Sequence, residues 1–93
     1  MKKNINKKLS ELLNLCRVGC GVSANDIVKL LSGKGYGSVN TLRVLLSDLK
    51  VYSVPIFRRD REKNARFQSD LVDIINNILD TDYSVEDVFG EER

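Results

Sequence analysis

The sequence has no histidine or tryptophan, one proline and two cysteines among its 93 residues. Without histidine, serine–histidine and cysteine–histidine catalysis and histidine-ligated metal sites are excluded. Two thiols are too few for a disulfide scaffold and one pair short of an all-cysteine zinc site. No apolar run approaches the roughly 20 residues that a membrane span needs, and no secretory segment follows Met1. We therefore expect a cytoplasmic protein that is not an enzyme, binds no metal or cofactor and does not contact the membrane.

Charge is abundant but unevenly divided along the chain. The formal net charge is only +2, yet residues 1–69 hold 14 basic and 5 acidic side chains, whereas residues 70–93 hold 8 acidic side chains and one arginine. Such asymmetry between segments is typical of nucleic-acid binding combined with an acidic tail or interaction face. At this length the chain forms one small domain.

Apolar side chains recur at the spacing of amphipathic helices in four stretches. These stretches predict a helix that ends at Gly19–Gly21, one that begins at the Ser23 cap, one that begins at Ser38 or Asn40, and one that begins near Ser69. Ser23 with Asp26, and Ser84 with Asp87, have the spacing of capping boxes, in which a hydroxyl and a carboxylate satisfy free N–H groups at a helix start.

Residues 51–57 are rich in β-forming side chains, and Pro55 indicates an edge strand. The polar residues 60–64 separate this stretch from residues 65–68. The pattern predicts a β-hairpin over residues 56–67. The expected fold is therefore mainly α with a small β-hairpin.

The order of these elements resembles the winged helix-turn-helix transcription regulators, most closely the penicillinase-repressor and MarR-like branches. Residues 22–31 are similar to the first helix of the motif, residues 38–49 to its recognition helix, and residues 56–67 to the wing. The resemblance implies a winged helix-turn-helix domain at 9–68. The residues themselves indicate a basic arm at 1–8 and a C-terminal helix with an acidic tail at 69–93, and the acidic segment is not part of the generic domain. The chain departs from the family in having no glycine at 50–53, between the recognition helix and the first wing strand.

The resemblance implies a dimeric, sequence-specific regulator of transcription that binds double-stranded DNA. In the major groove, asparagine pairs with adenine, arginine with guanine, and threonine or valine contacts a thymine methyl group. Asp48 is the discordant residue on the predicted recognition helix, and an ordinary amphipathic surface helix is the alternative. The predicted contacts on or beside this helix are Lys34, Ser38, Asn40, Thr41, Arg43, Val44, Ser47 and Lys50.

The predicted wing carries a dense group of cations that would contact phosphates or enter the minor groove. The alternative is a charged edge strand that resists aggregation. These cations are Arg58, Arg59, Arg61, Lys63 and Arg66.

The last predicted helix has an apolar stripe that would pack on the first helix, form a homodimer, or do both. The stripe consists of Leu71, Ile74, Ile75, Ile78 and Leu79. The acidic C-terminal segment, which also carries Val85, Val88 and Phe89, supports a rival function. In that rival, the chain is a protein-interaction module: an adaptor, a co-regulator or an inhibitor encoded by a phage or plasmid.

Cys16 and Cys20 lie one helical turn apart. They are either small buried hydrophobic residues or, with Arg17 nearby to lower a thiol pKa, a redox sensor.

Overall fold

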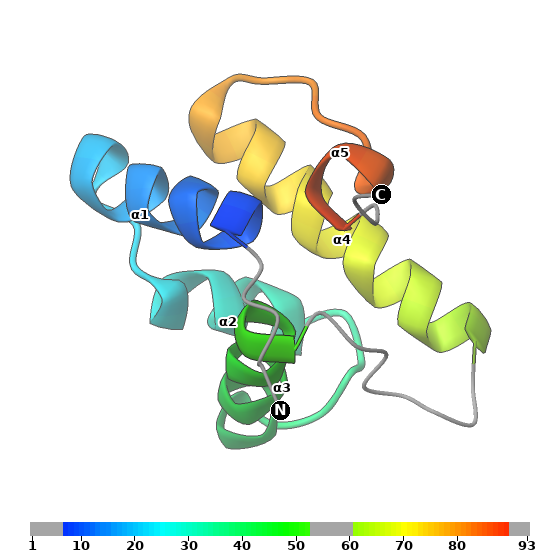
Figure 1. Ribbon diagram of the computed structural model, residues 1–93. Coiled ribbons are helices and arrows are strands. Elements are labelled where there is room, and N and C mark those ends of the chain that lie inside the picture. The colour runs from blue at the N-terminus through cyan, green and yellow to red at the C-terminus, as the bar shows by residue number, and fades with distance from the viewer. Residues whose placement is uncertain (1–6, 53–60, 90–93) are drawn as a thin grey trace.

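The computed structural model describes residues 7–52 and 61–89, and gives only the backbone for residues 48–52 and 61. The described residues form five helices and no strand. The helices are α1 (Lys7–Cys20), α2 (Ala24–Ser32), α3 (Val39–Tyr52), α4 (Arg61–Leu79) and α5 (Val85–Phe89). Helix α4, the longest, packs against α1 and α2, and the short α5 folds back onto α1 and α4 (Figure 1).

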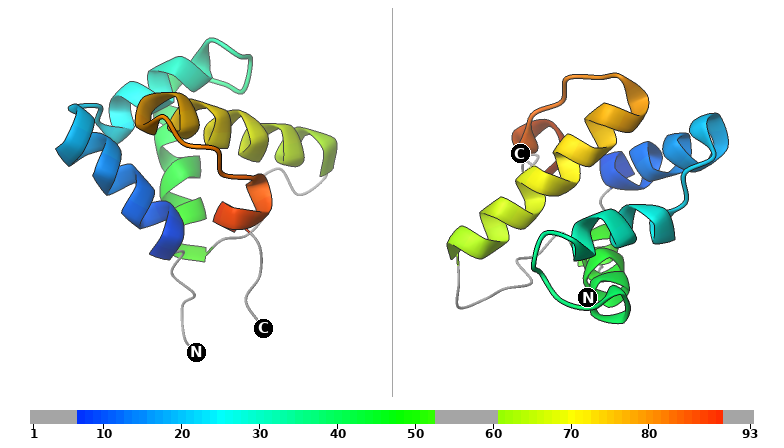
Figure 2. Two further views of the ribbon diagram at one scale, coloured as in Figure 1. Left: turned by 90° about the horizontal axis from the view of Figure 1, so that it is seen from above. Right: turned by 180° about the vertical axis from the view of Figure 1, so that it is seen from behind.

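Helix α3 is steeply inclined to α2 and lies at one edge of the molecule (Figures 1 and 2). Its buried face joins a single hydrophobic core to which all five helices contribute. Each fully buried leucine or phenylalanine stabilises the fold by roughly 1.5–3 kcal/mol. The largest side chains with less than 2% exposure are Phe67, Leu9, Leu12, Ile27, Leu31, Leu42, Leu71 and Ile75.

The predicted capping boxes are confirmed. The Ser23 hydroxyl accepts a hydrogen bond of 3.2 Å from the Asp26 amide, and the Ser23 amide donates one of 3.0 Å to the Asp26 carboxylate. Ser84 and Asp87 exchange the same pair of bonds at the start of α5. Gly21, with φ at +70°, ends α1 as the sequence predicts, and the amide that follows it closes the last turn on the Cys16 carbonyl.

The predicted β-hairpin is wrong where the structure describes it. Residues 61–67, assigned from sequence to the hairpin and its second strand, form the first two turns of α4. Val51 and Tyr52, expected to begin a strand, belong to the last turn of α3. Residues 53–60, which include Arg58 and Arg59, lie outside the described residues. The fold is therefore mainly α, and the expected division between residues 68 and 69 falls inside a continuous helix.

Helix formation at residues 61–68 has a physical cause. This stretch contains no glycine, proline or β-branched residue, and it is rich in arginine, glutamate, lysine, alanine and glutamine, all good helix formers. Glu62 lies in the first turn, where a carboxylate favours the positive end of the helix dipole. Phe67 precedes Leu71 by four residues and so extends the apolar stripe of the C-terminal helix by one turn. Phe67 is itself a weaker helix former, and its complete burial in the core outweighs that preference.

Candidate nucleic-acid interface

The connection between α2 and α3 is a six-residue turn that contains two glycines with positive φ. Gly35 and Gly37 have φ values of +91° and +131°, which residues other than glycine rarely adopt. After this turn Ser38 begins α3, because its hydroxyl accepts a hydrogen bond of 3.2 Å from the Thr41 amide. The Ser38 hydroxyl also donates to the Thr41 hydroxyl at 3.1 Å. These two residues, both predicted to contact DNA, are exposed but partly engaged with each other at the start of the helix.

Four of the other predicted contacts lie together on the outer surface of α3. Their i, i+3, i+4, i+7 spacing places them on one face, where they line a single shallow hollow. All four are exposed, whereas Leu42 and Leu46 bury the opposite face. We call this surface the α3 stripe; it consists of Asn40, Arg43, Val44 and Ser47.

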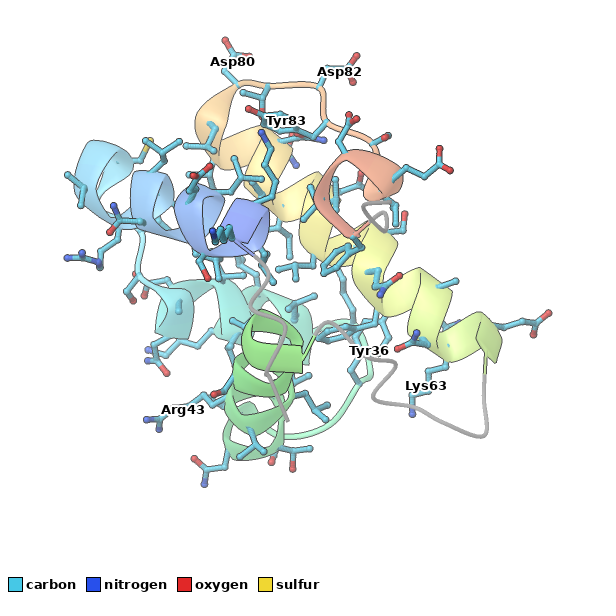
Figure 3. All side chains as sticks on the ribbon, in the orientation of Figure 1. Tyr36, Arg43, Lys63, Asp80, Asp82 and Tyr83 are labelled. Atoms are coloured by element: carbon cyan, nitrogen blue, oxygen red, sulfur yellow. The ribbon has the colours of Figure 1, made fainter. Side chains whose placement is uncertain are left out.

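The α3 stripe carries one cation and no carboxylate. Figure 3 shows Arg43 projecting outward from α3, at the opposite end of the molecule from Asp80 and Asp82. Glu86 and Asp87 are also exposed near that acidic end. The acidic residues that follow α4 therefore lie away from Arg43, whereas the cation Lys8 approaches their segment, 4.6 Å from the centroid of the Tyr83 ring.

The turn before α3 is fastened to α4 by Tyr36, a residue that the sequence did not single out. Tyr36 is only 4% exposed, its ring meets that of Phe67 edge-on at 5.1 Å between centroids, and its hydroxyl donates to the Asp70 carboxylate at 2.5 Å. Burial, together with the Asp70 carboxylate, raises the pKa of Tyr36. The Arg66 guanidinium lies over the ring, 5.7 Å from its centroid. Figure 3 shows Tyr36 between the turn and α4.

The remaining predicted cations do not join the α3 stripe. The Arg66 guanidinium lies over the Tyr36 ring. Lys63 is half-buried about one turn before Phe67, so both cations belong to α4 rather than to a wing. Lys34 borders a different, apolar groove. For Lys50 and Arg61 the structure describes only the backbone. The apolar groove, between α2 and α4, is lined by Leu30, Gly33, Lys34, Ile74, Asn77 and Ile78.

The residues predicted to form a dimer are mostly used within the chain. Leu71 and Ile75 are fully buried and Ile74 nearly so, because α4 packs against both α1 and α2. Ile78 and Leu79 are half-buried at the edge of the core. The apolar residues of the C-terminal segment behave in the same way: Val88 is buried, and Val85 and Phe89 pack against the core.

The two cysteines have different surroundings. Cys16 is buried, and this burial raises the pKa of its thiol, which makes the reactive thiolate scarcer. Cys20 is exposed, and its thiol donates to the Ile78 carbonyl at 3.5 Å. The surroundings of Cys16 are those of a small buried hydrophobic residue.

Within residues 7–52 and 61–89, no group of three or more cysteine or acidic side chains is placed to hold a metal ion. No helix in the same described ranges has both the length and the apolar character for crossing a bilayer. No protein-family model matches the chain, and no curated protein or solved structure matches it either.

Proposed function

We propose that the protein is a sequence-specific DNA-binding regulator of transcription that places α3 in the major groove. The observation that carries this proposal is the α3 stripe: four exposed side chains on one helical face, at the edge of the molecule, without a carboxylate among them. A major groove about 12 Å wide admits an α-helix, and polar side chains along its outer face can reach base edges.

The residue types of the stripe match the donor and acceptor pattern of base edges. Asn40 suits the N6 and N7 atoms of adenine, and Arg43 suits the O6 and N7 atoms of guanine. The acidic side chains at the other end of the molecule would point away from the phosphates. A homodimer forms part of the proposal, because two copies of α3 would then reach successive major grooves about 34 Å apart. Light scattering on the purified chain measures that oligomeric state.

The test separates contacts with bases from general attraction to phosphate. Arg43→Ala is compared with Arg17→Ala, an equal loss of charge on α1, where the Arg17 guanidinium donates to the Asn14 side chain at 2.8 Å. In a competition assay on duplexes selected from a random library, Arg43→Ala and Asn40→Ala reduce the preference for the selected sequence by roughly tenfold or more. Arg17→Ala leaves that preference unchanged. Equal effects of the two arginine substitutions would contradict the assignment of α3.

The rival function is protein binding through the acidic C-terminal segment. It depends mainly on exposed carboxylates, because Val88 is buried and Val85 and Phe89 are half-buried against the core. Asp82→Asn and Glu86→Gln remove two of these charges without touching the core. If these variants lose a protein partner while the wild-type chain shows no affinity for duplex DNA, the rival replaces the proposal.

A further inference from the structure

We infer that Val44 reads the C5 methyl group of a thymine in the DNA site, so that this site contains one thymine whose methyl group is required. The inference rests on the proposed function. It adds that the base in contact with the centre of the α3 stripe carries a methyl group.

Among the described residues, Val44 is not part of the hydrophobic core. Its side chain is 61% exposed, while the packing of α3 is provided by buried Leu42 and Leu46. Valine is also a poorer helix former than the alanine, lysine or glutamate that an exposed position usually carries. Single exposed apolar residues are common on protein surfaces. Val44 differs in its setting, since it shares one hollow with three polar residues of the α3 stripe.

This setting matches the major-groove edge of a thymine within a mixed sequence. Thymine is the only unmodified DNA base that presents a methyl group there, and a small aliphatic side chain gains from excluding water beside it. The polar neighbours of Val44 suit base edges that carry donors and acceptors. A hollow with one apolar side chain among three polar ones therefore fits a methyl group flanked by polar edges.

Helix geometry restricts where that thymine lies. Residues four positions apart are separated by about 6 Å along the helix axis, and neighbouring base pairs by about 3.4 Å. The thymine that contacts Val44 should therefore lie within about two base pairs of the bases contacted by Asn40 and Ser47.

Replacing thymine by deoxyuridine tests the inference, because this change removes the methyl group and keeps every hydrogen-bonding atom. Duplexes are first selected from a random library with the wild-type chain, and each thymine of the selected site is then replaced in turn. We expect one position at which the replacement weakens binding about fourfold, the gain from burying one methyl group. Val44→Ala withdraws two methyl groups from the contact, so the sensitivity of this variant to deoxyuridine should be smaller than that of the wild type.

Val18→Ala is the matched control, because Val18 is 67% exposed on α1 and lies outside the stripe. It should keep the full sensitivity to deoxyuridine. If a preferred site is selected but no thymine is sensitive, or if Val44→Ala is as sensitive as the wild type, the inference about Val44 is overturned and the proposed function stands. If the chain selects no duplex at all, the proposed function fails, and the inference fails with it.

Discussion

The Tyr36 hydroxyl donates a hydrogen bond of 2.5 Å to the Asp70 carboxylate and so joins the turn before α3 to the middle of α4. The same ring packs edge-on against Phe67. The start of α3 is thus held by a helix that lies far from it in sequence. The orientation of the α3 stripe depends on this contact as well as on the packing between α2 and α3.

Removing the hydroxyl should weaken the fold without opening a cavity. Tyr36→Phe keeps the ring against Phe67 and loses one hydrogen bond to a charged acceptor, at a cost of about 1.5 kcal/mol in the free energy of unfolding. Urea denaturation followed by circular dichroism measures this loss. Asp70→Asn keeps an oxygen acceptor and should cost less. Equal stability of Tyr36→Phe and the wild type would show that the bond does not fasten the turn.

Stability should fall at alkaline pH through the same residue. Burial first, and then Asp70, raise the pKa of Tyr36 above its ordinary value of about 10. A group with a raised pKa in the folded state contributes stability that is complete below its unfolded pKa and is lost as pH rises through its folded pKa. Above about pH 10 the wild type should therefore lose stability more steeply than Tyr36→Phe. Parallel pH profiles of the two chains would contradict this.

A single glycine substitution distinguishes a helix from a hairpin at residues 61–67. Ala65 is exposed within α4, so Ala65→Gly should lower the free energy of unfolding by about 1 kcal/mol. In a turn between two strands the same change would be neutral or favourable. Thermal unfolding of the variant provides the measurement, and an unchanged or raised midpoint argues against the helix.

Two glycines should respond in opposite directions to alanine. Gly21 has a φ of +70°, so Gly21→Ala should destabilise the chain by about 1–2 kcal/mol. Gly33 has a φ of −74°, and an added Cβ would meet the Leu30 carbonyl at an ordinary 3.6 Å. Gly33→Ala should therefore be neutral or stabilise by up to about 1 kcal/mol, because it restricts the unfolded chain. Similar losses in both variants would contradict the two backbone conformations.

Local signals in the sequence predict much of this fold. The Ser23 and Ser84 caps depend on residues three positions apart, and Gly21 acts within one helical turn, so neighbouring residues suffice to identify them. The start of α4 differs from the prediction because the charged residues 60–64 have the composition of a turn. The spacing of Phe67 and Leu71 was the available signal for a longer helix.

Local sequence patterns do not identify contacts between distant residues. Tyr36 and Asp70 are separated by 34 positions, and no local pattern pairs a tyrosine in a glycine-rich turn with a carboxylate on a later helix. The width of the apolar stripe on α4 likewise suggested a second subunit. The structure shows α1, α2 and α5 covering much of it within the same chain. The residues on the outer face of α3 can be predicted from sequence. The periodicity of the apolar residues identifies the buried side of the helix, and the outer face is the opposite side.

The most direct test of the account is the affinity of the wild-type chain for labelled duplex DNA across a series of salt concentrations. The account predicts binding that weakens linearly on a log–log plot, with a slope of about −0.9 for each phosphate neutralised. No binding at about 50 mM salt, or an affinity that does not change between about 50 and 200 mM, would contradict it.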